Sequence, residues 1–170
     1  VQAIARTIDK RLHRTTDFTI ERFLRDVFLY VSLPAVTREI NAIVEKTITA
    51  EPTIVIGHSL GSVVAYNVLR ANKQRMDLRH YITVGSPLGL RVVSSKLGVP
   101  ENPVGPSGWY NAWDERDIVA LNPLDDRWFP TDPPIENSNH VNNRTDNRHG
   151  IIGYLDDREV AARIAAALVA

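Results

Sequence analysis

A five-residue segment, Gly57-His58-Ser59-Leu60-Gly61, places a serine between two glycines, one two positions before it and one two positions after it. The segment follows a β-branched run, Thr53-Ile54-Val55-Ile56, and precedes apolar residues at helical spacing, so we expect a sharp turn between a strand and a helix. A serine on such a turn projects its hydroxyl beyond the sheet, and the glycines let strand and helix pass closely without a Cβ clash. The pattern therefore indicates a nucleophilic Ser59, with the Leu60 N–H at the helix N-terminus as one donor to an oxyanion. The alternative is a glycine-rich turn in which Ser59 only caps the helix.

A serine hydroxyl is a weak nucleophile at neutral pH and needs a base and a group that orients the base. The chain has five histidines, of which His140 and His149 come late in the sequence. We favour His149, because His149-Gly150 opens a helical segment after a polar loop. The other histidines are less well placed as a base: His13 lies in a first predicted helix, and His80 precedes a strand at the end opposite the serine. His58 flanks the serine with its side chain expected to point away, and we expect it to shape the site.

The acid is expected after a strand that lies between the serine and the histidine. The segment that follows the predicted strand Trp109–Trp113 offers three carboxylates, and we rank Asp117 first, Asp114 second and Glu115 third. Asp117 precedes the apolar pair Ile118-Val119, which would anchor its loop in the core. Asp125 and Asp126 are less well placed, because prolines bracket them in an irregular segment.

These groups need a framework to bring them together, and the apolar patterning predicts an α/β fold. Residues 1–49 are expected to be helical, with a break at Asp17 and a new helix at Pro34. The run that starts at Thr53 lacks alternation and is typical of a strand buried on both faces of a parallel sheet, as is Tyr81–Gly85. A strand–helix–strand unit of this kind requires a parallel crossover.

The later elements are a strand at Trp109–Trp113, one strand near Ile135–Val141, and a last helix that opens with Asp156-x-x-Glu159. No linker separates two cores, so we expect one domain over residues 1–170, with a helical segment (1–49) and a segment that carries the proposed site (53–170). The inward faces of two helices are predicted as follows: Val36, Ile40, Ile43, Val44 and Thr47 or Ile48 after Pro34; Val160, Ala161, Ile164, Ala165 and Leu168 in the last helix.

At this point the residues resemble a known family. Gly57-His58-Ser59-Leu60-Gly61-Ser62 is similar to the nucleophile elbow of the α/β-hydrolase superfamily, particularly its lipase and esterase branches. Val84-Gly85-Ser86-Pro87-Leu88-Gly89 is similar to the turn after the next strand of those enzymes, where Ser86 and Pro87 would shape the site. The resemblance runs from about Thr53 to the C-terminus. It implies a three-layer α/β/α sandwich with a mostly parallel sheet, and hydrolysis of small-molecule or lipid carboxylic esters through an acyl-enzyme without a cofactor. Asp117 and His149 take the places of the family's acid and base.

The chain departs from that family before the elbow. Residues 1–49 contain no glycine, so no loop of the family's His-Gly or Gly-Gly type brings a second oxyanion donor over Ser59. The first predicted strand would also be left with an unpaired edge. We therefore expect the N-terminal strands to be missing, with these residues forming the C-terminal part of a longer hydrolase that needs its upstream segment.

Composition excludes several other classes. The 20 Lys and Arg residues balance the 20 Asp and Glu residues, so no basic field attracts nucleic acid. The absence of cysteine excludes a disulfide framework and a thiolate metal site, and neither H-E-x-x-H nor G-x-G-x-x-G occurs, so we expect no metal. Without a secretory signal or an apolar run of membrane-spanning length, we expect a cytoplasmic protein with no integral membrane segment.

Two other functions stay open. One is a non-catalytic binding module built on the same fold, and the other is an amidase or acyltransferase that uses the same three residues. The aromatic pairs Trp109/Trp113 and Trp128/Phe129 are candidates for an acyl pocket, although core packing is favoured for residues of this size.

Overall fold

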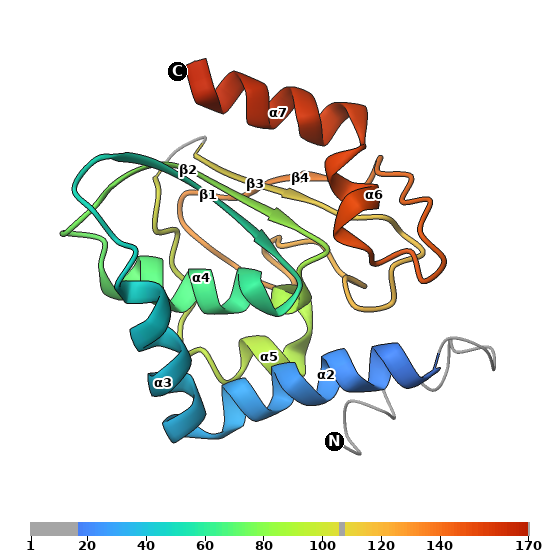
Figure 1. Ribbon diagram of the computed structural model, residues 1–170, viewed down its shortest axis with the longest axis horizontal. Coiled ribbons are helices and arrows are strands. Elements are labelled where there is room, and N and C mark those ends of the chain that lie inside the picture. Colours follow the sequence, from blue (N-terminus) through green and yellow to red (C-terminus); the bar gives the residue numbers. More distant parts are fainter. Residues whose placement is uncertain (1–16, 106–107, 170) are drawn as a thin grey trace.

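The computed structural model describes residues 17–105 and 108–169, and Figure 1 shows a sheet with helices on both of its faces. The prediction of a helix over residues 1–12, with His13, lies outside the described residues. In chain order the elements are α2 (Asp17–Ser32), α3 (Pro34–Glu45), β1 (Pro52–His58), α4 (Leu60–Ala71), β2 (Asp77–Val84), the 3₁₀ turn η1 (Pro87–Gly89), α5 (Arg91–Ser94), β3 (Trp109–Ala112), β4 (Glu136–Ser138), α6 (Ile151–Leu155) and α7 (Arg158–Val169).

The four strands form one sheet in the order β1-β2-β3-β4, and every pair is parallel. The register runs from Pro52 opposite Asp77 to His58 opposite Val84 in the first pair, so the carboxyl ends of neighbouring strands lie level. The predicted α/β fold with a parallel sheet is confirmed. The four strand positions expected from the sequence are also found, with β4 shorter than the predicted segment near Ile135–Val141.

Side chains of successive strand residues enter two different cores, one on each face of the sheet. Tyr81 and Trp109 pack on the α4 side, whereas their neighbours Ile82 and Tyr110 pack on the α7 side. This two-sided burial explains why the central strands show no alternation of apolar and polar residues. Trp109 and Phe129 are fully buried in the α4-side core, with ring centroids 5.9 Å apart, as core packing predicts.

The expectation of full burial is wrong for β1. Within the described part of the chain β1 pairs only with β2 and forms the edge of the sheet (Figure 1), and Ile56 is 42% exposed. The physical reason is that α4 covers one face of β1, whereas on the opposite face α7 packs against β2. The prediction that further strands precede β1 stays a prediction.

The start of the last helix differs from its prediction. Asp157, not Asp156, accepts hydrogen bonds from the backbone N–H groups of Glu159 (2.9 Å) and Val160 (3.3 Å), so α7 begins later than the capping pattern suggests.

Two helix faces also differ from their predictions. The residues of α7 that face the core are Val160, Ile164 and Ala167, whereas Ala161, Ala165 and Leu168 are exposed. In α3, Ile43 is 64% exposed, because only one side of this helix contacts α2 and α4.

The helices of the described residues also bear on membrane association. None of them is on its own both long and apolar enough to cross a membrane, although Glu21–Ser32 and Pro34–Glu45 satisfy those criteria as a pair bent by 97°.

Candidate active site

The carboxyl ends of the four parallel strands meet at one edge of the sheet, and the three residues predicted to do the chemistry, Ser59, Asp117 and His149, each come after the end of a strand. Ser59 comes directly after β1, Gly85 directly after β2, and Asp117 shortly after β3. A long loop after β4 leads to His149. In open α/β sheets this edge is where ligands bind, because the connecting loops there are free to vary.

Ser59 sits on the turn between β1 and α4 in a strained conformation. Its φ of 52° and ψ of −131° lie in a region that residues with a Cβ rarely adopt, at a cost of about 1–3 kcal/mol. Its side chain makes no capping hydrogen bond to α4. Its Oγ instead lies 2.8 Å from Nε2 of His149, so the interpretation of Ser59 as a simple helix cap is wrong.

Neighbouring groups hold the turn in this conformation. The Ser59 N–H donates to the Val84 carbonyl at 3.3 Å, and Ser62 Oγ donates to the Ser59 carbonyl at 2.6 Å. Because that donation uses the single proton of Ser62, the Ser86 hydroxyl is the donor in the 2.7 Å contact between the two serines. Ser86 Oγ in turn accepts from the Leu88 N–H at the start of η1, which Pro87 opens, so the turn after β2 supports the turn after β1.

The two glycines of the motif are not equivalent. A Cβ on Gly57 would lie 2.7 Å from the Ser62 Cα, so strand and helix approach each other too closely for a side chain there. Around a Cβ on Gly61, in contrast, no atom of the described residues lies within 4 Å apart from the two neighbouring residues and the adjoining backbone of α4 itself. The close-approach role expected from the sequence therefore applies to Gly57 and is wrong for Gly61.

This difference gives a testable prediction. Gly57→Ala is expected to destabilise the protein by about 1–3 kcal/mol, because the backbone of α4 must move to admit the methyl group. Gly61→Ala is expected to raise stability by about 0.5 kcal/mol, because alanine is the better helix former. Urea denaturation of the two variants measures both effects. Equal destabilisation by the two substitutions would contradict this account of the turn.

His149 and Asp117 complete a continuous chain of hydrogen bonds from Ser59. His149 Nδ1 lies 2.7 Å from Asp117 Oδ2, and the two side chains are buried, at 1% and 0% exposure. The Val119 N–H donates to Asp117 Oδ1 at 2.9 Å, and Val119 itself is fully buried. The apolar pair after Asp117 thus anchors the loop of the acid in the core.

Asp114 is buried as well but faces a different set of partners. It forms an ion pair with Arg116 at 2.8 Å and accepts a hydrogen bond from the Asn143 N–H at 2.8 Å. Burial alone would raise the pKa of Asp114, but the hydrogen bonds from Arg116 and Asn143 outweigh it and hold that pKa below its usual value. Asp114 therefore fixes the loops around the site without contacting His149.

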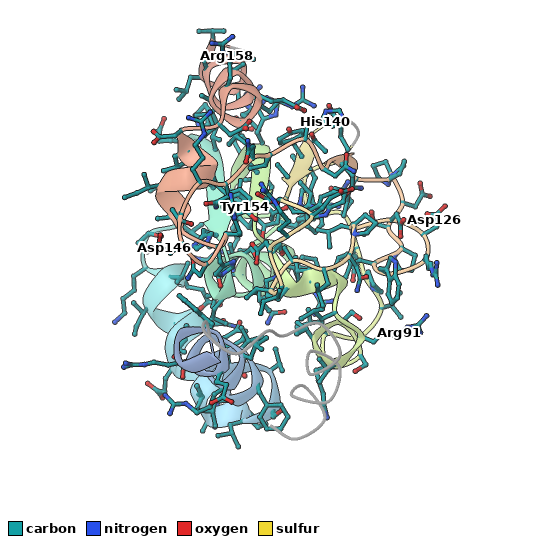
Figure 2. The ribbon with its side chains drawn as sticks, turned by 90° about the vertical axis from the view of Figure 1, so that its right-hand side faces the viewer. Arg91, Asp126, His140, Asp146, Tyr154 and Arg158 are labelled. Carbon is teal, nitrogen blue, oxygen red and sulfur yellow. The ribbon has the colours of Figure 1, made fainter. Side chains whose placement is uncertain are left out.

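The remaining candidates of the sequence analysis lie away from Ser59. His140 is at the surface (Figure 2), with a side chain 78% exposed and 3.3 Å from Glu159. Glu115 accepts from Asn139, and Asp125 accepts from the backbone of its own turn. Asp126, labelled in Figure 2, is exposed.

His58 contributes to the site in a way that the sequence analysis did not foresee. Its side chain does not point away but packs against His149, with ring centroids 4.7 Å apart. Its Nε2 lies 2.8 Å from the His149 carbonyl, which can only accept, so Nε2 carries the proton. Burial and the neighbouring His149 lower the pKa of His58, which favours the neutral ring. His58 thus holds the backbone that presents His149.

Three further residues that support His149 were missed. Phe23 of α2 packs edge-on against the His149 ring, with ring centroids 5.1 Å apart. Asn143 is fully buried and donates to the Gly150 carbonyl at 2.9 Å, although its segment looked like a polar loop. Tyr154 of α6 projects into the interior (Figure 2) and bonds to Asp117. Nothing in the sequence distinguishes Tyr154 from the other aromatic residues.

The arrangement has the parts for nucleophilic catalysis at a carbonyl group. Ser59 Oγ lies within hydrogen-bond distance of Nε2 of His149, whose Nδ1 contacts the buried Asp117 carboxylate, and Leu60 begins α4, where the first N–H groups have no partner within the helix. Within the described residues no three histidine, aspartate or glutamate side chains gather closely enough to hold a metal ion.

Comparison with known proteins found no relative of this chain. No protein-family model, no curated protein and no solved structure matches this chain. The function must therefore be inferred from the residues and their geometry.

Proposed function

We propose that this chain is a serine hydrolase of the α/β-hydrolase type that cleaves carboxylic esters through an acyl-enzyme intermediate. The observation that carries the proposal is the hydrogen-bonded chain from Ser59 Oγ to His149 (2.8 Å) and from His149 to Asp117 (2.7 Å). A catalytic triad is recognised by this geometry and by the role of each group, not by sequence position. The chain order Ser…Asp…His on a parallel sheet supports the same proposal, since it is the order typical of this superfamily.

In the acylation step, Ser59 Oγ attacks the ester carbonyl carbon while its proton moves to His149 Nε2. A carbon–oxygen bond forms, and the carbonyl electron pair moves onto the oxygen, where the Leu60 N–H at the start of α4 donates to it. The tetrahedral intermediate then collapses and expels the alcohol, which takes the proton from His149. Water repeats the sequence with the acyl-enzyme, releasing the carboxylic acid and restoring Ser59.

Asp117 sets the direction of this proton transfer. Because its carboxylate accepts from Nδ1–H of His149, the lone pair of the imidazole lies on Nε2, which faces Ser59. The buried carboxylate also stabilises the imidazolium that forms during each step.

The proposal is tested by covalent labelling with an alkyl phosphonate that carries an aryl leaving group. An activated serine displaces the aryl group, so we expect one adduct, located on Ser59 by peptide mass spectrometry. Ser59→Ala should abolish labelling, while the matched control Ser95→Ala, at an exposed serine, should leave it unchanged. No adduct on Ser59 would contradict the proposal and favour a non-catalytic module.

Labelling alone does not separate an esterase from an amidase or acyltransferase, because all three use the same residues. Hydrolysis of aryl esters of increasing acyl length, beside the matching anilides, makes that distinction. We expect the esters to be cleaved and the anilides not, whereas preferential cleavage of the anilides would assign an amidase.

A further inference from the structure

Asp117 has a hydrogen-bond donor that the triad does not require. Tyr154 Oη lies 2.6 Å from Asp117 Oδ2, the same oxygen that accepts from His149 Nδ1 at 2.7 Å. A carboxylate only accepts, so the phenol is the donor, and 2.6 Å is the length of a charge-assisted O–H···O⁻ bond. Tyr154 and Asp117 are both 0% exposed, so bulk water does not compete for this contact.

The fold holds Tyr154 in this place through two other contacts. The Asp114 N–H donates to Tyr154 Oη at 3.3 Å. Gly85, at a φ of 58°, lies beside the pair, and a Cβ there would be 2.9 Å from Tyr154 Cε2 and 3.2 Å from Asp117 Oδ2. The glycine of the turn after β2 therefore leaves the space in which the phenol and the carboxylate meet.

The titratable groups around this pair come from three segments: β1, the loop after β3 and the loop that precedes α6. His149 and Asp117 are the triad members themselves. His58 on β1 has its ring 5.9 Å from that of Tyr154, and Asp114 after β3 is paired with Arg116. Burial, reinforced by the negative charge of Asp117, raises the pKa of Tyr154 well above its usual value, so the phenol keeps its proton and stays a donor.

We propose that Tyr154 is a positioning residue. Its hydrogen bond withdraws negative charge from the Asp117 carboxylate, and this lowers the affinity of His149 for the proton that Nε2 accepts. Two donors on one carboxylate oxygen share its negative charge, so less of that charge remains to stabilise an imidazolium at His149. His149 is then free to act as a base at a lower pH than it would be beside Asp117 alone. This inference rests on the proposed roles of Asp117 and His149.

Tyr154→Phe in the 170-residue chain tests the inference, because it removes the hydroxyl and keeps the buried ring. We expect the acid limb of kcat/KM for an aryl ester to move to higher pH by about 0.5–1 unit. At an acidic pH, where kcat/KM still rises with pH, the value for Tyr154→Phe should be about three- to tenfold below that of the wild type. At higher pH, where kcat/KM no longer changes with pH, the difference should be smaller. Replacement of Tyr154 with 3-fluorotyrosine, a stronger donor, should move the limb in the opposite direction.

Tyr110→Phe is the matched control. It removes another largely buried phenol from the same side of the sheet, one that donates to Glu159 at 2.9 Å instead of to the triad. The acid limb should not move in this variant. An equal displacement by both substitutions would indicate a general loss of packing and overturn the inference.

A second measurement does not depend on catalysis. The pH midpoint at which the His149 ring gains its proton, followed by NMR, should rise in Tyr154→Phe and stay constant in Tyr110→Phe. An unchanged midpoint and an unchanged limb would overturn the role of Tyr154 and leave the proposed function standing. If instead the wild-type protein neither cleaves esters nor reacts with the phosphonate, the proposed function fails, and the NMR midpoint still decides whether Tyr154 acts on the pair.

Discussion

Ser59→Ala is expected to lower the turnover of an aryl ester by about 10⁴-fold or more, because it removes the atom that forms the covalent bond to the acyl group in the proposed mechanism. His149→Ala should cause a loss of similar size, since without the base the hydroxyl keeps its proton. The double variant should be no slower than either single variant, because the two residues act as one unit. Initial-rate measurements on the purified proteins give all three values. Wild-type turnover by Ser59→Ala would contradict the mechanism.

The strain at Ser59 provides an independent check on the same residue. A φ of 52° with a ψ of −131° costs energy for any residue with a Cβ and little for glycine. Ser59→Gly is therefore expected to be inactive and yet more stable than the wild type, by about 1 kcal/mol in urea denaturation. A gain in stability on loss of the hydroxyl would indicate that a serine occupies this strained position because its hydroxyl is needed for catalysis, not because it stabilises the fold. A loss of stability would show that Ser59 serves the packing of the turn.

The parts of this site that could be predicted from the sequence are those encoded locally. The turn at Ser59 is specified by a β-branched run, a glycine and a helical pattern within a short segment, and the structure has strand, turn and helix in that order. Asp117 could be ranked above Asp114 because the apolar residues after it predict burial, and Val119 does anchor that loop. The structure brings Ser59, Asp117 and His149 together, while their chemical roles stay predictions.

The features that sequence reasoning missed depend on contacts between distant segments. The exposure of Ile56 follows from the position of β1 at the edge of the sheet, which a pattern within one strand does not encode. Tyr154 and Asn143 act through the backbone and side chains of loops far from them in sequence, so neither has a periodicity that reveals its role. The prediction for Gly61 was wrong for a different reason. The motif was interpreted as needing glycine here to avoid a Cβ clash, but the structure leaves room for a Cβ at this position.

Asp117→Asn is expected to lower turnover by about 10⁴-fold with little change in the fold, because asparagine matches the shape of aspartate but can donate a hydrogen bond. An amide N–H directed at His149 Nδ1 would leave the proton on Nε2, which then faces Ser59 and cannot accept from it. The loss should appear in kcat, because in the proposed mechanism Asp117 orients His149 and does not contact the substrate. Steady-state kinetics on the two proteins measure it.

Asp114→Asn is the matched variant, since it makes the same chemical change at a buried carboxylate in the same loop. It breaks the ion pair with Arg116 and not the contact to His149, so turnover should fall by less than about tenfold while stability falls by about 1–3 kcal/mol. Because the pKa of Asp114 is lowered in the folded state, its contribution is present above the unfolded value of about 3.9 and is lost as the pH falls through the folded value. The stability difference between wild type and Asp114→Asn should therefore shrink below about pH 4, a trend that urea titrations at several pH values can follow. A larger loss of turnover in Asp114→Asn than in Asp117→Asn would transfer the role of orienting acid to Asp114.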